Sequence, residues 1–288
     1  MPIFGATARM IDRVIDSESA SATVLSKVIL RDAGMAARVL ALANSAYFSL
    51  GHQAVATVSR AILMLGFDAV RAAALSVALI DALATGGVRA RVHAGMAQAF
   101  HAAVQARQIS AWRGDGGVEE IFIGALLAQI GTIAFWCYSG DVGVRLDQAL
   151  SAEADAGEEV EERVLGFRLR HLTAVLAREW QLTPMVSLVA QGAVSQRSRE
   201  FAVMLGHRLA QTAARGWHHA ATAQIVDEIS AYCGRTSADL YPRLEENARA
   251  AAEVARSYGA FAAAEMIAQC APAADEAPFA QLASEPIR

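Results

Sequence analysis

The stretch from residue 29 to residue 66 constrains the fold more than any other part of the chain. Asp32 precedes a run in which Met35, Val39 and Leu42 fall close to one face of a helix. The Asp32 carboxylate can accept an N–H group of the first helical turn, which would otherwise lack a partner. This pattern predicts a helix that begins just after Asp32.

A break and a second helix follow in the same stretch. Asn44 and Ser45 interrupt the apolar run where the carbonyl groups of an ending helix need partners. Thr57 or Ser59 can start the next helix, which we expect to end at Gly66. The stretch therefore predicts two helices joined by a structured elbow.

The composition favours a folded, all-α protein. Hydrophobic residues make up 55% of the 288 residues and charged residues 19%, which is typical of a globular chain rather than a disordered one. Alanine is abundant, there are only 6 prolines, and β-branched runs are short. The length suits one large domain or two small ones.

Apolar periodicity and turn residues predict further helices. Two short helices are expected between residues 7 and 30, and Asp68 can cap a long helix that ends near Gly86. Another helix is expected over residues 88–112, followed by a glycine-rich turn. We expect the N-terminal group of helices to form a five-helix lobe.

The uncharged segment 121–140 is nearly long enough to cross a bilayer, which takes roughly 20 residues. It contains Gln129 and several glycines, and it lacks the flanking basic cluster of an anchored span. We therefore expect a buried core helix and no membrane span.

These features together resemble the HD-related output domain (HDOD) family. That family has an acidic residue, a helix ending in L-x-x-A-N-S, a short loop with aromatic residues, and A-I-x-x-L-G. The corresponding elements are Asp32, Leu40 to Asn44 with Ser45, Tyr47 with Phe48, and Ala61 and Ile62 with Leu65 and Gly66. Ala33 stands where the family usually has proline. Several spaced elements in the right order make the match specific.

A second landmark of the family is a helix that ends in tryptophan before a proline-containing turn. Residues 165–184 fit this description, with Trp180 at the helix end. We expect Trp180 to be a core anchor, because its spacing from Leu172 and Leu176 places these side chains near one face. Gly131 belongs to the same family signature.

The resemblance implies an all-α, two-lobed HDOD/HD-like fold with additional C-terminal helices. We expect an HDOD domain over residues 6–195, divided into an N-terminal lobe at about 6–87 and an HD-like lobe at about 88–195. Three or four further helices over residues 196–270 should pack on it as an extension. Residues 271–288, rich in proline and small residues, are expected to form a flexible tail.

The parent HD superfamily consists largely of metal-dependent phosphohydrolases, whose His and Asp side chains hold metal ions that activate water. His93 approximates the first of these histidines, but Ala128 and Gln129 stand where active members carry the His-Asp doublet. A further histidine position falls at Leu169. The resemblance therefore implies a vestigial pocket with no metal, no cofactor and no catalytic residue, and the chain is expected not to be an enzyme.

The remaining histidines predict no site. His101 and His207 have no acidic neighbour at a useful spacing, and His218 and His219 form no i, i+4 pair. We expect all four at the surface.

Charge gives one weak indication of a ligand. Arg168, Arg170 and Arg178 could face an anionic ligand such as a nucleotide, although solvated helix charges explain them more simply. The acidic run 153–162 is interpreted as a solvated helix face. The net charge of −4 and pI near 6.0 give no general attraction to nucleic acid.

The leading hypothesis is a non-catalytic signal-transduction module that acts by binding a protein partner or a ligand. The resemblance implies bacterial signalling. Three isolated cysteines and the absence of a secretory signal indicate the cytoplasm. The alternative is a divergent metal-dependent HD-type phosphohydrolase that uses His93. A nucleic-acid or nucleotide-binding module ranks third.

Overall fold

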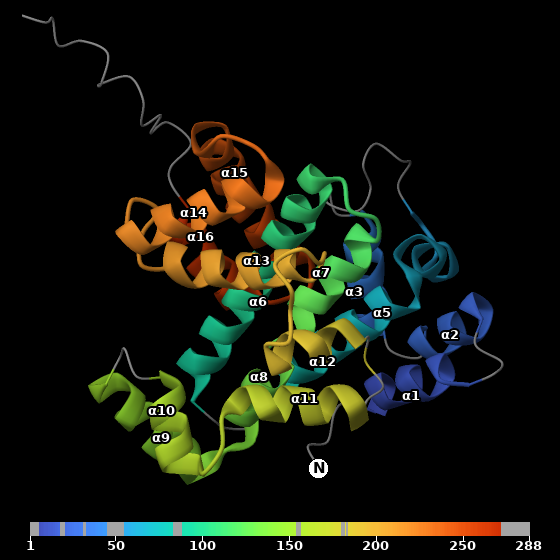
Figure 1. The fold of residues 1–288 in the computed structure, drawn as a ribbon. Coiled ribbons are helices and arrows are strands. Elements are labelled where there is room, and N and C mark those ends of the chain that lie inside the picture. The colour runs from blue at the N-terminus through green and yellow to red at the C-terminus, as the bar shows by residue number, and fades with distance from the viewer. Residues whose placement is uncertain are drawn as a thin grey trace, which may run out of the picture.

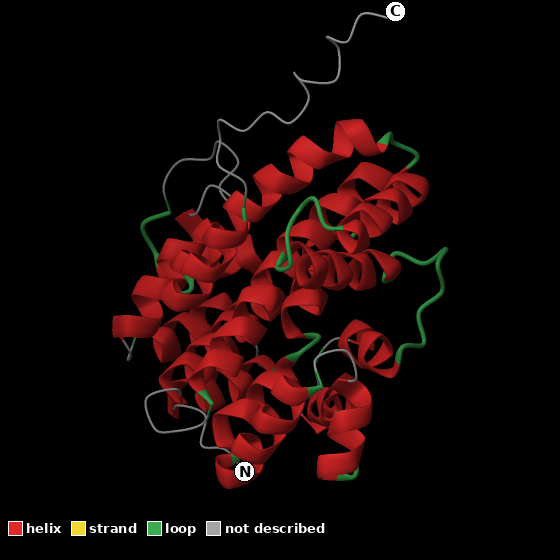
Figure 2. Ribbon diagram, turned by 90° about the vertical axis from the view of Figure 1, so that its left-hand side faces the viewer, coloured by secondary structure: helices red, strands yellow, loops and turns green. Residues whose placement is uncertain are grey.

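The computed structural model describes residues 6–17, 21–30, 33–44, 55–82, 88–153, 157–179, 182 and 184–271. Helices dominate these ranges, and no strand occurs in them (Figure 1, Figure 2). The all-α prediction is therefore confirmed. In chain order the helices are α1 (Ala6–Ile15), α2 (Ala22–Ile29), α3 (Ala33–Asn44), α5 (Val58–Ala82), α6 (Arg89–Arg113), α7 (Val118–Leu127), α8 (Ile130–Tyr138), α9 (Gly140–Ala152), α10 (Gly157–Leu165), α11 (Leu169–Glu179), α12 (Pro184–Gln191), α13 (Phe201–Ala213), α14 (Ala220–Cys233), α15 (Ser237–Ser257) and α16 (Phe261–Cys270).

The N-terminal helices α1, α2 and α3 pack against α5. The Thr57 hydroxyl accepts a hydrogen bond from the N–H of Arg60 at 3.4 Å, so it caps the start of α5 as expected. Gly66 adopts φ 79° and ψ 164°, which side chains other than glycine rarely tolerate. The helix expected to end at Gly66 and the long helix expected to begin near Asp68 therefore follow one another across a kink at Gly66, and α5 continues to Ala82.

Asn44 forms the elbow predicted after α3. Its side-chain amide donates to the carbonyl of Val55 at 2.8 Å, and its side-chain oxygen accepts from the Val55 N–H at 2.6 Å. These two bonds join the end of α3 to the segment that leads into α5. Two other family-signature residues of this region, Asp32 and Ser45, lie outside the described residues.

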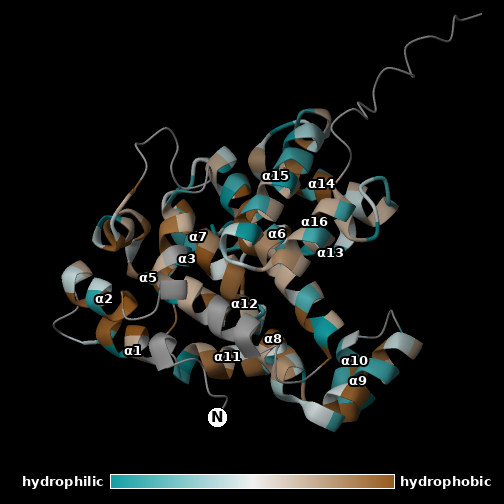
Figure 3. Ribbon diagram, turned by 180° about the vertical axis from the view of Figure 1, so that it is seen from behind, coloured by the Kyte–Doolittle hydropathy of each residue, from teal (hydrophilic) through white to brown (hydrophobic). Residues whose placement is uncertain are grey.

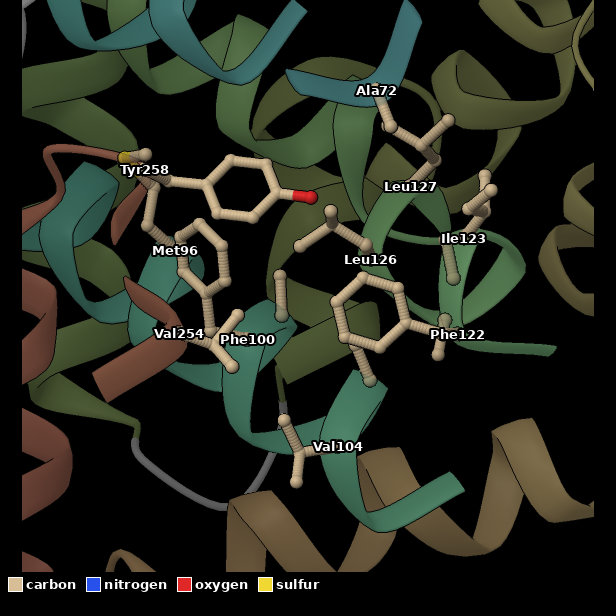
Figure 4. Close-up of a cluster of buried hydrophobic side chains, with 14 of the residues drawn as sticks. Ala72, Met96, Phe100, Val104, Phe122, Ile123, Leu126, Leu127, Val254 and Tyr258 are labelled. Carbon is tan, nitrogen blue, oxygen red and sulfur yellow. The ribbon is translucent and has the colours of Figure 1, made fainter. Parts of the chain in front are cut away.

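The long helix α6 lies at the centre of the molecule (Figure 1). It packs against α7, α13, α15 and α16. Phe100 of α6 meets Tyr258 edge-on with ring centroids 5.0 Å apart, and Phe122 and Leu126 of α7 lie in the same cluster (Figure 4). Gly206 lets α13 approach closely, because an added Cβ there would lie 2.6 Å from a backbone oxygen of α6.

The apolar segment that we expected as one buried helix consists of two helices, α7 and α8. Gln129 separates them with a non-helical φ of −112° and ψ of 16°. Among the described residues, Val118–Tyr138 is the one segment that could span a membrane by length and composition, and 72% of its window is buried. Most of this segment is buried inside the protein, as the sequence predicted for a core element.

The helices after residue 200 pack back onto the centre, since α13, α15 and α16 all contact α6. Thr236 caps α15, because its hydroxyl accepts from the N–H of Asp239 at 3.2 Å. Pro184 is the first residue of α12. Trp180 and the expected flexible tail beyond residue 271 lie outside the described residues.

The α9–α10 unit lies at the periphery (Figure 1) and carries many polar residues (Figure 3). Helix α9 contacts α8, and α10 packs on α9. Ion pairs connect the unit to the rest of the molecule: Arg91 with Asp147 at 2.6 Å, and Arg168 with Glu158 at 2.8 Å. Polar contacts therefore supply much of its attachment.

Candidate functional site

A polar cavity of about 840 Å³ lies between the α9–α10 unit and the body formed by α6, α8, α11 and the end of α13. Ala128, Gln129 and Leu169, which the sequence marked as vestigial pocket positions, all line it. The structure thus brings the adjacent residues Ala128 and Gln129 together with Leu169, which is distant from them in sequence.

His93 is not among the residues that line this cavity. It lines a separate hollow of about 150 Å³, together with Met96 and the segment 259–263 before and within α16. Gln98, five residues further along α6, lines the larger cavity instead. The positions expected to form one vestigial pocket therefore do not all meet.

His207 positions Gln129 at the edge of the cavity. Its Nε2 donates to the carbonyl of Ala125 at 2.9 Å, and its Nδ1 accepts from the Gln129 side-chain amide at 3.4 Å. The Ala125 carbonyl lies in the last turn of α7 and also accepts the N–H of Ala128 at 3.4 Å, so the His207 bond is its second. Burial lowers the pKa of His207 to about 4, so the ring is neutral near pH 7.

Gly131 allows α11 to approach α8 closely enough to form the cavity wall. Its N–H donates to the Thr173 hydroxyl at 3.1 Å. A Cβ at this position would lie only 2.2 Å from the backbone nitrogen of Thr173. This close contact places Leu169 and Thr173 on the wall, and Leu169 is fully buried.

Three arginines from different elements line the cavity: Arg91, Arg170 and Arg215. Arg91 lies over the Trp136 ring at 5.7 Å in addition to its ion pair. The Nε of Arg170 lies 3.5 Å from a carboxylate oxygen of Glu158. Within the described part of the chain, Arg215 makes no ion pair.

The carboxylates of the cavity do not form a metal site. Glu158 is shared between two arginines, and Glu161 accepts the N–H of Leu169 at 2.8 Å. Burial raises the pKa of Glu161, which disfavours the charged form that a metal ion needs. No group of three or more His, Cys, Asp or Glu side chains among the described residues is placed to hold a metal ion. The residues present therefore do not fit the metal of the HD superfamily.

A family model for the HDOD domain matches residues 1–192. The chain belongs to the HDOD family. The match covers the helix–elbow–helix stretch and both lobes that the sequence predicted, up to the end of α12. No curated protein matches this HDOD chain.

Solved structures share the fold of this HDOD protein. An HDOD domain protein with unknown function from Geobacter sulfurreducens has a TM-score of 0.63 at 18% identity, covering 89% of this chain and 93% of its own. A Shewanella amazonensis SB2B protein named as a phosphohydrolase has a TM-score of 0.62 at 18% identity, covering 93% and 95%. A Marinobacter aquaeolei VT8 protein named as a signal transduction protein has a TM-score of 0.59 at 22% identity, covering 91% and 60%. At these identities the likeness establishes the fold alone.

The three arginines expected to face an anion do not converge in the HDOD structure. Arg168 is held by Glu158 and by Glu162, the latter at 3.0 Å. Arg170 lines the main cavity, whereas Arg178 lines another hollow of about 370 Å³. Arg168 and Arg170 both face the Glu158 carboxylate, whereas Arg178 lies about two helical turns beyond Arg170 along α11.

The expectation that His101 lies at the surface is wrong, and His207 is part-buried rather than exposed. His101 is 4% exposed, and its Nε2 accepts a hydrogen bond of 3.0 Å from the Gln105 amide. Burial lowers its pKa to about 4. His218 and His219 are exposed as expected, and the His219 ring accepts from a backbone N–H at the start of α14.

Sequence reasoning missed most of the residues that give the cavity its polarity. Arg91, Gln98 and Gln211 line it, yet none belongs to a motif. The spacing of Arg91 and Gln98 on α6 could have suggested a common face, because seven residues span two helical turns. Nothing in the sequence connects them to Gln211, more than a hundred residues further on.

Proposed function

We propose that this HDOD protein is a non-catalytic regulatory module of a bacterial signalling pathway. The observation that carries the proposal is the lining of the cavity at Ala128, Gln129 and Leu169. A methyl group, an amide and a hydrocarbon chain cannot replace the imidazole and carboxylate donors that hold a catalytic metal ion. The cavity measures about 840 Å³ and has a polar lining, so we assign it to binding rather than to hydrolysis.

The walls of the cavity suggest how binding produces a signal. Glu158 and Glu159 come from α10, whereas Gln129 and Thr132 come from the break before α8 and from α8 itself. A ligand in the cavity contacts both the α9–α10 unit and the body. The ligand therefore stabilises the arrangement of the α9–α10 unit and the body that it contacts best. A ligand changes a conformational equilibrium only through such a difference in contacts.

The ion pairs at the edge of the cavity make this arrangement responsive. Arg91 binds Asp147 at 2.6 Å and the Ser151 hydroxyl at 3.3 Å, and both partners lie on α9. Half-exposed pairs of this kind each contribute at most about 1 kcal/mol. A ligand that engages Arg91 can therefore shift the α9–α10 unit at low cost, and this shift would present a different surface to a protein partner.

The names of the structural relatives include both alternatives, a signal transduction protein and a phosphohydrolase. An assay for hydrolysis of a generic phosphodiester in the presence of Mn²⁺ distinguishes a regulatory protein from a phosphohydrolase. We expect the purified chain to hydrolyse bis(p-nitrophenyl) phosphate no faster than buffer, with or without a chelator. The variants His93→Ala and Gln129→Ala should leave that background unchanged.

Turnover that a chelator abolishes and that Gln129→Ala lowers would overturn the proposal, because the cavity would then be catalytic. Turnover lowered by His93→Ala alone would also overturn it and would place the site at the hollow beside α16. The Arg178→Ala variant, which alters a different hollow, is purified in the same way as the wild type and serves as the control. A contaminating phosphodiesterase would give the same turnover in all of these preparations.

A further inference from the structure

A second, smaller cavity of about 170 Å³ adjoins the polar one. It lies where α6, α13 and α16 meet, and apolar side chains form most of its lining. These are Ala94 and Ala97 of α6, Ala210 and Ala214 on or just after α13, and Met266 and Ile267 of α16. The four alanines explain the hollow, since their short side chains leave the space between the helices unfilled.

Two glutamines belong to both cavities. Gln98 and Gln211 each line the 840 Å³ polar cavity and the 170 Å³ apolar one. They therefore stand at the boundary, one on α6 and the other in the last turn of α13. Neither side chain has a hydrogen-bond partner within the described residues, so both amides are available to a bound molecule.

A cation lies on the polar side of this boundary. Arg215 lines the larger cavity and is four residues beyond Gln211. It differs from Arg91 and Arg170, whose guanidinium groups already face Asp147 and Glu158. An anionic group that binds Arg215 therefore does not have to displace a carboxylate of the protein.

We propose that the two cavities form one binding site for a small amphiphilic carboxylate. Its apolar part, about six carbons long, occupies the alanine-lined cavity, and its carboxylate pairs with Arg215 beside the amides of Gln98 and Gln211. The size follows from the volume, because an apolar cavity of about 150 Å³ accommodates benzene. The carboxylate follows from the single available guanidinium, which binds a carboxylate through two parallel hydrogen bonds.

His101 closes the inner end of the apolar cavity without supplying charge. Its ring is buried and bonded to Gln105, which in turn donates to the Leu244 carbonyl at 2.7 Å. The inner end is therefore neutral and already satisfied in hydrogen bonds. A hydrocarbon group suits this end, whereas a second polar group would lose its water there without a partner.

This inference rests on the proposed function only in treating the larger cavity as a binding site. The test is calorimetric titration of the full chain with hexanoate, acetate and 1-hexanol. Hexanoate has four more methylenes than acetate, and each buried methylene strengthens binding roughly fourfold. Hexanoate should therefore bind about 250-fold more tightly if all four are buried, and at least about 16-fold more tightly if two are. Arg215→Ala should weaken hexanoate by up to about fivefold, as for an exposed ion pair, and leave 1-hexanol unchanged.

Ala214→Leu fills the apolar cavity from an exposed position, so it disturbs no packed core. We expect this variant to lose the advantage of hexanoate over acetate. Ala238→Leu, on an exposed face of α15, and Arg178→Ala, in a separate hollow, are the matched controls and should bind hexanoate like the wild type.

Two results would overturn the inference. One is equal affinity for hexanoate and acetate in the wild-type chain. The other is hexanoate binding that neither Ala214→Leu nor Arg215→Ala weakens relative to its control. Phosphodiester turnover tests the proposed function separately: a catalytic chain could still bind hexanoate here, and a chain that rejects hexanoate could still be a non-catalytic regulator.

Discussion

The contact between α8 and α11 makes Gly131→Ala the sharpest stability prediction. The substitution places a methyl group 2.2 Å from the backbone nitrogen of Thr173 and 2.6 Å from the carbonyl carbon of Leu172. Both are backbone atoms, so no change of side-chain rotamer relieves the overlap. The two helices must separate, and the wall of the polar cavity that carries Leu169 must move with α11.

The magnitude follows from three effects at Gly131. Overpacking of a buried contact costs about 1–3 kcal/mol. Stretching the 3.1 Å hydrogen bond from Gly131 to Thr173 costs roughly 1 kcal/mol more. The better helix propensity of alanine offsets up to about 1 kcal/mol. We therefore expect the free energy of unfolding to fall by about 2 kcal/mol.

Urea denaturation of the wild type and two glycine variants measures this change. Gly116→Ala is the control, because an added Cβ there meets no atom within 4 Å. It should change the free energy of unfolding by no more than about 0.5 kcal/mol. The reasoning is refuted if Gly131→Ala is as stable as Gly116→Ala with an unchanged denaturant slope.

Three further predictions use the same measurement. Asn44→Ala removes both hydrogen bonds to the part-buried backbone of Val55 and should cost about 1–3 kcal/mol, and a loss below 0.5 kcal/mol would argue against the elbow. Burial lowers the pKa values of His101 and His207 from 6.5 to about 4, so the unfolded chain binds more protons within that window. Stability should therefore fall as pH drops from 6.5 to 4, and His101→Gln and His207→Gln should each flatten the decline. Thr236→Ala should cost about 1 kcal/mol through the lost cap of α15, and an unchanged stability would contradict that cap.

The sequence predicts the helices well because their ends carry local signals. Thr57 and Thr236 cap helices through hydrogen bonds within three residues, and Pro184 begins α12. Such contacts are encoded in neighbouring residues, so a pattern can reveal them. Gly66 carries a local signal of the same kind, because the expected helix end at this glycine is a kink within α5.

The break between α7 and α8 was not predicted, because no local signal marks it. The run around Ala128 and Gln129 contains no proline and reads as continuous. His207 contacts both sides of the break, since its ring bonds to the Ala125 carbonyl and to the Gln129 side chain. His207 is part-buried there, whereas the sequence had predicted a surface position.

The candidate site shows a similar division between local and distant information. The family pattern located Ala128, Gln129 and Leu169, which line one cavity, because the resemblance carries three-dimensional information that the residues alone do not. The family pattern placed His93 in the same pocket, which is wrong. The long helix α6 is uninterrupted around His93, so no turn signal shows which of its faces lines the cavity. The position of Gln98 in the cavity and the ion-pair partners of the arginines depend on which helices pack together. The sequence alone does not show that packing.

The central claim is that the cavity occupies the place of a metal centre whose donor atoms are missing. The most direct test is the Mn, Fe and Zn content of the wild-type chain beside that of Ala128→His/Gln129→Asp/Leu169→His, which restores the family's ligands. The account predicts far less than one metal ion per wild-type chain and a higher content in the triple variant. About one ion per wild-type chain, removed by Gln129→Ala, would contradict it.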